Sequence, residues 1–409
     1  MAKKAVRPDK KAILLISDGL GDRPNQELGG KTPLEYANTP NMDRLSKLSE
    51  VGMVHTVPDG MKPGSDVANL SVLGYNPQEN YSGRSPLEAL SIGVAMKDSD
   101  VAIRTNVVTL SDDDLPYEEK TIIDHSSSEI DTEDAAILIE AVKKELANEM
   151  FAFYVGTSYR HLLIWDKGRV VELTPPHDIL GKTIGEYLPK ESLLFEMQKR
   201  SYEILNNHPI NVARAAKGLN KANSIWFWGA GTKPILTSFE KKTGKKGAMI
   251  SAVDLLKGIA VGAGMDNKIV EGANGQLHTN YEGKAQAAVD ALTKEGYDFA
   301  YIHVEAPDEM GHQGSVERKV QAIEYLDERV IRYVKEAMDA SGEDYRMLIL
   351  PDHPTPIEVR THTSEPVPYL LYDSTNLQEN NWQYSEKCAK AGGICHPLGH
   401  ELIDYLFSK

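Results

Sequence analysis

Three apolar runs in this chain are each followed closely by side chains that can bind a metal ion. The runs are AILLI at 12–16, FAYIHV at 299–304 and MLIL at 347–350. The polar residues that follow them are Asp18, Asp308, His312, Asp352, His353 and His362. An uninterrupted apolar run suits a strand buried on both faces, and open α/β sheets place their chemistry just beyond such strand ends. The spacing therefore predicts a ligand cluster at one edge of a parallel sheet.

The strongest local pair is Asp308 and His312, whose i, i+4 spacing lets a carboxylate and an imidazole converge on one ion if the segment turns helically. Each pair alone also fits an ordinary loop with turn residues and one capped histidine. The repetition of the pattern at three strand ends favours a metal site.

Ser65 opens a helix-compatible run directly after Pro63-Gly64. A serine at a helix N-terminus is commonly the N-cap. The alternative is a nucleophile, because the free N–H groups at a helix start favour an incoming phosphate. A metal ion could lower the pKa of the hydroxyl. Both interpretations stay open from these residues alone.

The candidate ligands comprise three carboxylates, three imidazoles and one hydroxyl, which are too many for one ion and suit two. They are Asp18, Ser65, Asp308, His312, Asp352, His353 and His362. A set of oxygen and nitrogen ligands without thiolate points to Mn²⁺, Zn²⁺ or Mg²⁺, and the share of carboxylates favours Mn²⁺. Two neighbouring ions form a clamp for phosphoryl transfer, because one activates the attacking oxygen and both neutralise charge on the phosphoryl group.

The elements that must position these residues alternate between strand and helix. Besides the three apolar runs, helical patterns occur at 252–259, 282–294 and 316–338. Such alternation predicts an α/β fold with a doubly wound, mostly parallel sheet and helices on both faces.

A smaller α+β domain is predicted as an insert at residues 81–187. The main domain would then comprise residues 1–80 and 188–409, including a helix at 191–205 and the strand SIWFW at 224–228. The glycine-rich segment that follows this strand lacks the Gly-Lys-Ser/Thr ending of a nucleotide-binding loop.

The predicted insert is rich in side chains that bind anions, namely Arg104, His125, Arg160, His161 and His177. The alternative is that these residues are scattered over the surface, and we expect this for some of the five.

Composition excludes several classes of protein. A formal net charge of −15 argues against a nucleic-acid partner. No apolar run reaches the length of a membrane span or of a signal-peptide core, and the basic run at 3–11 suggests a solvated arm. Two cysteines, Cys388 and Cys395, provide no disulfide framework, so a reducing cytoplasm is expected. Their spacing to His396 and His400 is irregular for a zinc site.

Taken together, six motifs resemble cofactor-independent (2,3-bisphosphoglycerate-independent) phosphoglycerate mutases of the archaeal type, which belong to the alkaline phosphatase-like superfamily. The motifs are ISDGLGD (16–22), PGSDVANLSVLGY (63–75), GRSPLEALSIG (83–93), HVEAPDEMGHQG (303–314), LPDHPTP (350–356) and THTSEPVP (361–368). The resemblance runs from about Lys11 to the C-terminus.

The resemblance implies that Ser65 is phosphorylated during the reaction. It implies one ion held by Asp308, His312 and His362, and a second held by Asp18, Ser65, Asp352 and His353. It further implies that the insert binds the glycerate, for which Arg104, Arg160 and His161 are the best matches, and that Lys221 reaches the phosphate.

The resulting hypothesis is an isomerase of glycolysis and gluconeogenesis that interconverts 3-phosphoglycerate and 2-phosphoglycerate without 2,3-bisphosphoglycerate. The expected partner is the small molecule phosphoglycerate, and neither a nucleic acid nor a membrane is expected to bind. The sequence does not distinguish a monomer from a homo-oligomer. The alternatives are a metal-dependent phosphomonoesterase, another phosphosugar mutase such as a phosphopentomutase, and a non-catalytic metal-stabilised scaffold. A substrate that carries a carboxylate favours bidentate arginine, whereas a pentose phosphate does not.

Overall fold

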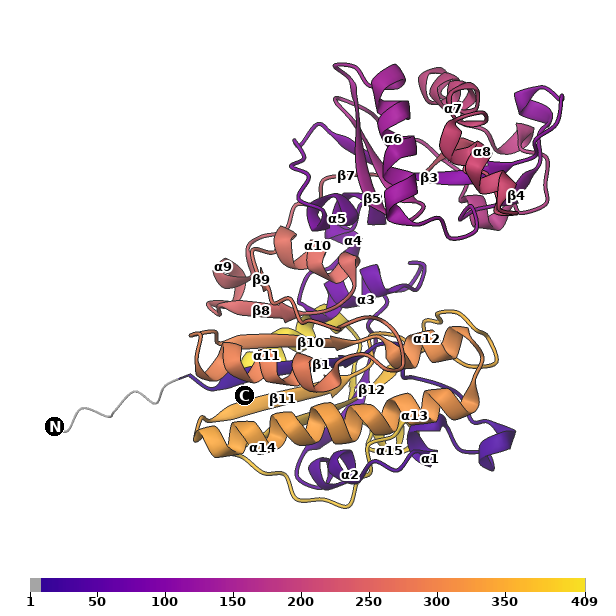
Figure 1. Ribbon diagram of the computed structural model, residues 1–409. Helices are drawn as coiled ribbons and strands as arrows, with labels where there is room; N and C mark the ends of the chain where they lie inside the picture. Colours follow the sequence, from indigo (N-terminus) through magenta and orange to yellow (C-terminus); the bar gives the residue numbers. More distant parts are fainter. Residues whose placement is uncertain (1–8, 409) are drawn as a thin grey trace. The chain divides into compact units, whose positions relative to one another are not determined.

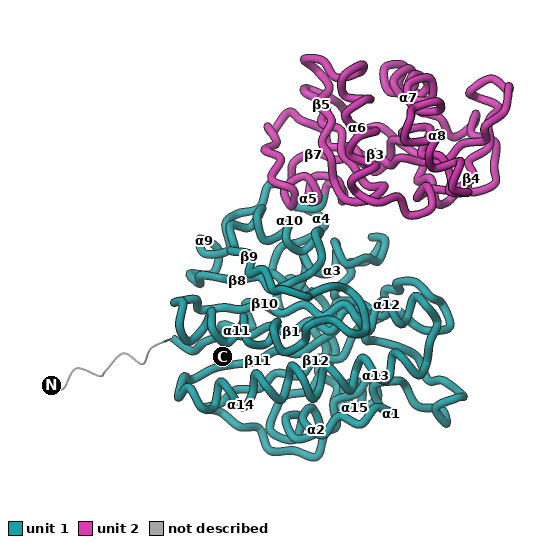
Figure 2. Tube along the Cα trace, in the orientation of Figure 1, with its two compact units in different colours: residues 1–81, 235–409 teal, residues 82–234 magenta. Residues whose placement is uncertain are grey.

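The computed structural model describes residues 9–408 of the chain, which divide into two compact units. Unit 1 comprises residues 1–81 and 235–409, and unit 2 comprises residues 82–234 (Figure 2). Residues 3–8 of the basic run predicted as a solvated arm lie outside the described residues. The rest of that run is ordered structure, because Lys10 pairs with Asp373 at 2.8 Å and Lys11 begins the first strand.

Unit 1 is built around an eight-stranded sheet of order β13-β2-β12-β11-β1-β10-β8-β9. All neighbouring strands pair in parallel except at β12, which is antiparallel to both of its neighbours. The predicted mostly parallel sheet is therefore confirmed. The strands are β1 (Lys11–Ser17), β2 (Glu50–Val54), β8 (Gly247–Ile250), β9 (Asp266–Asn267), β10 (Phe299–Val304), β11 (Tyr345–Leu350), β12 (Val367–Asp373) and β13 (Cys395–His396).

Helices cover both faces of this sheet. The main core packs α11 (Tyr281–Thr293), α13 (Val316–Leu326) and α14 (Arg332–Ser341) against alternate residues of the central strands, such as Ile13 and Ile302 (Figure 1). On the other face, the Phe299 ring contacts Phe239 of α9 (Phe239–Thr243) and Phe407 of α16 (Leu402–Ser408). This alternation is the expected period of two in a strand.

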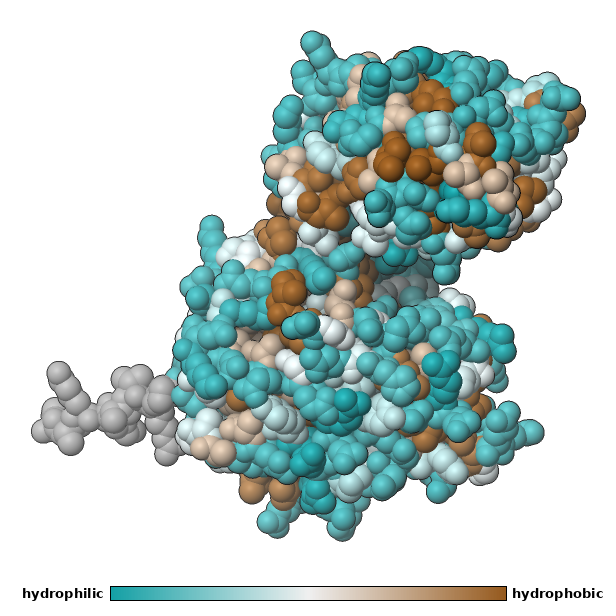
Figure 3. Space-filling view, viewed as in Figure 1, coloured by the Kyte–Doolittle hydropathy of each residue, from teal (hydrophilic) through white to brown (hydrophobic). Residues whose placement is uncertain are grey.

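The remaining α-helices of unit 1 are short. They are α1 (Pro33–Tyr36), α2 (Pro40–Ser46), α3 (Ser65–Val72), α4 (Pro77–Asn80), α10 (Asp254–Gly262), α12 (Ala306–His312) and α15 (Glu386–Ala391). No helix among residues 9–408 is long and apolar enough to cross a membrane. The visible surface is mostly hydrophilic, with smaller hydrophobic patches (Figure 3).

Unit 2 is an antiparallel sheet with helices packed on it. Its strands are β3 (Val101–Leu110), β4 (Ile122–Asp124), β5 (Phe151–Thr157), β6 (Arg160–Trp165) and β7 (Ser224–Thr232). Its helices are α5 (Arg84–Ser91), α6 (Thr132–Leu146), α7 (Ser192–Leu205) and α8 (Pro209–Ala216).

The insert extends further along the chain than the predicted range of 81–187. Strand β7, which contains the SIWFW run, pairs antiparallel with β3 from Val101 to Val108. Helix α7 contributes Leu194 and Leu205 to the core of the same unit. Assigning residues 188–234 to the main domain was therefore wrong, because strand pairing between β3 and β7 is non-local and leaves no local sequence signal.

Candidate active site

The central strands of unit 1 bring the predicted ligands to one edge of the sheet. Strand β1 lies between β10 and β11, so the loops that leave these three strands are neighbours. The strand ends are level, because Ile16 is opposite both His303 of β10 and Leu350 of β11. Asp18, Asp308 and Asp352 follow those ends and converge.

The first candidate metal group consists of Asp18, Asp352 and His353, all of which are buried. The Nε2 atom of His353 lies 3.3 Å from Oδ1 of Asp18 and 3.4 Å from Oδ2 of Asp352. It also lies 3.0 Å from Oγ of Ser65. The structure thus brings together the four residues that the resemblance assigns to the ion beside the serine.

The second candidate group consists of Asp308, His353 and His362. Oδ1 of Asp308 lies 3.3 Å from Nε2 of His362, and its Oδ2 lies 3.2 Å from Nε2 of His312. The Nε2 atoms of His312 and His362 are 3.0 Å apart. His312 therefore joins this set, and His353 is common to both groups.

The donor set fits divalent cations. Oδ1 of Asp18 is buried without a hydrogen bond. Burial, followed by the charges of Asp352 and Asp308, raises the pKa of Asp18 well above its usual range. For Asp308 burial acts in the same direction, but hydrogen bonds from His312 and His362 outweigh it and hold its pKa well below the usual range. A bound cation would balance this buried negative charge and give the facing imidazole nitrogens a common partner.

Ser65 is the first residue of its helix and does not cap it. Helix α3 begins at Ser65, with Gly64 in the N-cap position and no side-chain cap. One turn later, Asn69 donates from Nδ2 to the Ser65 carbonyl at 2.7 Å and to Oδ2 of Asp352 at 2.8 Å. The Tyr301 hydroxyl in turn donates to Oδ1 of Asn69. These contacts hold the start of α3 against the ligand cluster.

Several supporting residues were missed by sequence reasoning. His303 lies 2.9 Å from Oδ2 of Asp18 through its Nε2 atom, and the hydroxyl of Thr355 donates to Oδ1 of Asp308 at 2.5 Å. Glu305 forms a third candidate metal group with Asp18 and Asp308. A histidine inside the otherwise apolar run of β10 was a visible signal for His303, since a buried polar side chain needs a partner.

Lys284 is a buried lysine near the third group. Its ammonium donates to the His303 carbonyl at 3.1 Å from within the core. Burial lowers the pKa of Lys284 to about 8, although the negative charges of Glu305 and Asp18 act to raise it. The lysine therefore offsets part of the negative charge on this side of the cluster.

A second buried lysine ties two of the ligand-bearing loops together. Lys319 is fully buried, and its ammonium donates at 2.9 Å to the carbonyls of Gly19 and Thr355. It also pairs with Oδ2 of Asp22 at 2.9 Å. Gly19 follows the candidate ligand Asp18, and Thr355 follows the candidate ligands Asp352 and His353. Lys319 is therefore a positioning residue.

We expect Lys319→Met to lower the free energy of unfolding by about 3 kcal/mol, because it leaves the buried Asp22 carboxylate unpaired. It should also weaken Mn²⁺ binding by about tenfold, as loss of an outer ligand support typically does. Urea unfolding and calorimetric Mn²⁺ titration measure the two effects.

The double variant Lys319→Met/Asp22→Asn separates the effect on stability from the effect on Mn²⁺ affinity. It removes the unpaired charge and should recover part of the stability, but the two loops remain untethered. Full recovery of Mn²⁺ affinity in the double variant would contradict the positioning role.

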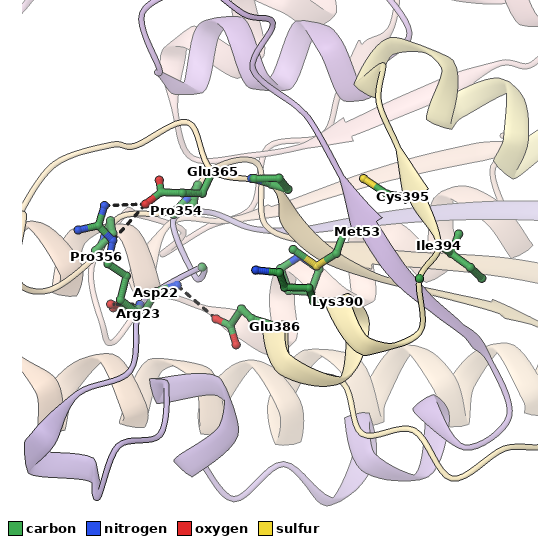
Figure 4. Close-up of a pocket in the computed structure, with 14 residues that line it drawn as sticks. Asp22, Arg23, Met53, Pro354, Pro356, Glu365, Glu386, Lys390, Ile394 and Cys395 are labelled. Carbon is green, nitrogen blue, oxygen red and sulfur yellow. Dashed lines mark hydrogen bonds and ion pairs between the residues drawn. The ribbon is translucent and has the colours of Figure 1, made fainter.

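A cavity of about 400 Å³ lies beside these loops (Figure 4). Its wall includes Asp22, Pro354 and Glu386, and the Glu386 carboxylate accepts a hydrogen bond from the Asp22 amide at 3.2 Å. None of the predicted metal ligands lines it. Cys395 lines it as well, and both Cys388 and Cys395 are free thiols. Within residues 9–408, the candidate metal groups do not include the tail cysteines or His396 and His400.

In unit 2, four of the six predicted substrate residues form one continuous cluster. Arg104 lies over the Trp228 ring at 4.0 Å, and the Trp228 ring contacts His177 at 5.2 Å. His177 is 6.1 Å from His125, which contacts Tyr159 at 5.7 Å. Arg160 completes the cluster by lying over the Tyr159 ring at 4.9 Å. Trp228 and Tyr159 had not been predicted.

The other two predicted residues do not join this cluster. His161 neighbours Arg160 on β6, so the two side chains point to opposite faces of the sheet. His161 is buried, its Nδ1 accepts a hydrogen bond from the Gly156 amide, and burial lowers its pKa to about 4. Lys221 instead pairs with Asp112 at 2.6 Å. The structure therefore does not bring His161 together with Arg104 and Arg160, because strand alternation places its side chain on the opposite face of β6.

Comparisons with known proteins identify the relatives of this chain. A family model described as 2,3-bisphosphoglycerate-independent phosphoglycerate mutase matches residues 46–211. A mutase of that name from Methanosarcina barkeri is 47% identical over 402 residues, which cover 97% of this chain and 99% of the relative. A probable mutase of the same name from Geobacter sulfurreducens is 46% identical over 405 residues, which cover 98% of this chain and 100% of the relative.

Two solved structures are similar to this chain. A protein from Pyrococcus horikoshii shares 32% identity with a TM-score of 0.80, covering 97% of this chain and 96% of its own. The cofactor-independent phosphoglycerate mutase of Thermoplasma acidophilum has a TM-score of 0.64 at 24% identity, covering 97% of this chain and 98% of its own. The latter similarity supports the shared fold.

Proposed function

The chain belongs to the 2,3-bisphosphoglycerate-independent phosphoglycerate mutases, and we propose that it interconverts 3-phosphoglycerate and 2-phosphoglycerate through a phosphorylated Ser65. The observation that carries this proposal is the position of Ser65 at the start of α3, with its Oγ atom 3.0 Å from His353 in a cluster of candidate metal ligands. The start of a helix also favours the phosphate dianion that the substrate delivers.

Two divalent cations are the proposed cofactors, with Mn²⁺ as the preferred ion because of the carboxylate share of the ligands. Asp308, His312 and His362 would hold one cation, and Asp18, Ser65, Asp352 and His353 the other, with His353 close to both sets. When bound, such ions lower the pKa of a coordinated hydroxyl and neutralise charge on the phosphoryl oxygens.

The residues of the chain then carry two successive transfers. In the first, Oγ of Ser65 gives up its proton and bonds to phosphorus while the bond from phosphorus to the substrate oxygen breaks, and that oxygen takes up a proton to leave glycerate. In the second, the other hydroxyl of the same glycerate gives up its proton and bonds to phosphorus while the bond from phosphorus to Oγ breaks, and Ser65 regains its proton. We propose that Arg104 and Arg160 retain glycerate through its carboxylate, because guanidinium groups bind carboxylates bidentately.

Retention of glycerate distinguishes a mutase from a phosphatase. If water reached the phosphoserine first, free phosphate would leave and the reaction would end as hydrolysis. A glycolytic substrate also suits an enzyme of the cytoplasm, which is the location we propose.

The deciding experiment incubates the Mn²⁺-loaded protein with 3-phosphoglycerate and no 2,3-bisphosphoglycerate. We expect 2-phosphoglycerate to form without a matching release of phosphate, with both products followed by ³¹P nuclear magnetic resonance. Dominant phosphate release would identify a phosphomonoesterase on the same site, and the absence of both products would refute the proposed chemistry.

A further inference from the structure

Arg104 in unit 2 is a buried guanidinium that uses few of its hydrogen-bonding groups. Its residue is only 7% exposed, and its Nε atom has no aligned hydrogen bond among the described residues. It is held by stacking on Trp228, which is its cross-strand partner on β7. A buried N–H donor without a well-aligned acceptor is costly, which makes this guanidinium a candidate for a ligand's carboxylate.

One carboxylate of the chain stands beside this guanidinium. Oε2 of Glu88 lies 3.1 Å from Nε of Arg104, and its Oε1 accepts a hydrogen bond from Nε of Arg84 at 3.0 Å. Burial lowers the pKa of Arg104 to about 10, Glu88 opposes that shift, and the charges of Arg84 and Arg160 add to it. Glu88 thus lies between the guanidinium groups of Arg104 and Arg84, and Arg160 adds positive charge near Arg104.

The glycine-rich segment after SIWFW places this carboxylate. Helix α5, which carries Arg84 and Glu88, packs against the end of β7. A side chain at Gly231 would collide with the Ser82 carbonyl, and the Ser85 hydroxyl donates to the carbonyl of Gly229. The glycines that do not form a nucleotide-binding loop therefore allow α5 to approach closely enough for Glu88 to reach Arg104.

We propose that Glu88 is an internal substitute for the substrate's carboxylate: it occupies the Arg104 guanidinium in the free protein and is displaced when phosphoglycerate binds. This inference rests on the proposed function, since it assumes that Arg104 receives the glycerate carboxylate. Glu88 neutralises the arginines while no ligand is present, and it must be displaced during each binding event. It therefore weakens substrate binding and favours ligands whose carboxylate competes effectively for Arg104.

The test is calorimetric binding to the Mn²⁺-loaded protein in a Ser65→Ala background, which prevents turnover. Two ligands are compared, 3-phosphoglycerate and glycerol 3-phosphate, which lacks the carboxylate. Removing the competitor with Glu88→Gln should tighten 3-phosphoglycerate binding about two- to fivefold, the range of a partly exposed ion pair. Binding of glycerol 3-phosphate should stay unchanged.

The matched control is Glu118→Gln, which removes a carboxylate of unit 2 that pairs with Lys199. It should alter neither affinity. Unchanged or weaker 3-phosphoglycerate binding by Glu88→Gln would show that Glu88 braces Arg104 and would overturn the inference. Equal tightening of both ligands would also overturn it, because the effect would then be one of net charge.

If Glu88→Gln does not fold, a second variant provides the same test. Glu88→Asp retains the charge but retracts the carboxylate by one methylene group, and it should also tighten 3-phosphoglycerate binding selectively. Unchanged binding in this variant overturns the inference as well. The wild-type mutase assay tests the proposed function separately: mutase activity without a ligand-specific effect at Glu88 refutes only the role of Glu88.

Discussion

Replacing Ser65 with alanine is expected to lower mutase activity by a factor on the order of 10⁴ or more, because a covalent route loses its acceptor atom. The substitution removes one hydroxyl at the first residue of α3, and its partner in the structure is Nε2 of His353 at 3.0 Å. The backbone contact from Asn69 to the Ser65 carbonyl is retained. The fold should therefore be preserved while the chemistry is lost.

Formation of 2-phosphoglycerate, followed through an enolase-coupled assay, measures the activity. Acid quenching followed by mass spectrometry should detect a phosphorylated Ser65 peptide in the wild type alone. Ser71→Ala is the matched control, because it removes a buried hydroxyl from the same helix that makes no hydrogen bond with the described residues. Substantial turnover by Ser65→Ala would exclude the phosphoserine route.

Replacing Asp18 with asparagine is expected to act in opposite directions on the metal-free and metal-loaded protein. Burial and the charges of Asp352 and Asp308 raise the pKa of Asp18 in the fold. An ionised Asp18 therefore costs stability at neutral pH when no cation is bound. Asparagine removes that cost and can still form a hydrogen bond with Nε2 of His303, so the metal-free variant should unfold at a higher temperature than the metal-free wild type.

With Mn²⁺ the order should reverse, because the variant loses a charged ligand and with it the stabilisation that binding provides. Mutase activity should fall on the order of 10³-fold or more, since charge at the transferred phosphoryl group is no longer balanced. Thermal unfolding with and without Mn²⁺, together with the coupled assay, measures these effects.

The pH dependence gives a further check on Asp18. The fold raises the pKa of Asp18, so protonation of Asp18 relieves the loss of stability that its charge causes. The difference in unfolding temperature between metal-free Asp18→Asn and the metal-free wild type should therefore shrink as the pH falls through that raised pKa. Asp254→Asn, an exposed position on α10, serves as the control. Equal destabilisation of Asp18→Asn with and without Mn²⁺ would make Asp18 a structural residue and not a ligand.

The sequence alone determined the candidate site in unit 1 because its signals are local. An apolar run such as AILLI and the polar Asp18 just beyond it are adjacent in the chain, so the change from apolar to polar residues at the strand end is visible in the sequence. The same holds for Asp308 and Asp352. The alternation of strands and helices likewise predicted a mostly parallel sheet, which the structure confirms.

Only the tertiary structure decided which of these groups meet and which do not. The order β10-β1-β11 brings three distant loops to one edge, and the pairing of β7 with β3 moves residues 188–234 into unit 2. The alternation of β6 separates His161 from Arg160, and α5 brings Glu88 to Arg104. The order of strands, the face on which a side chain lies and the packing of a helix depend on contacts between residues far apart in the chain. Hydrophobic periodicity within a segment does not indicate which other segment it packs against.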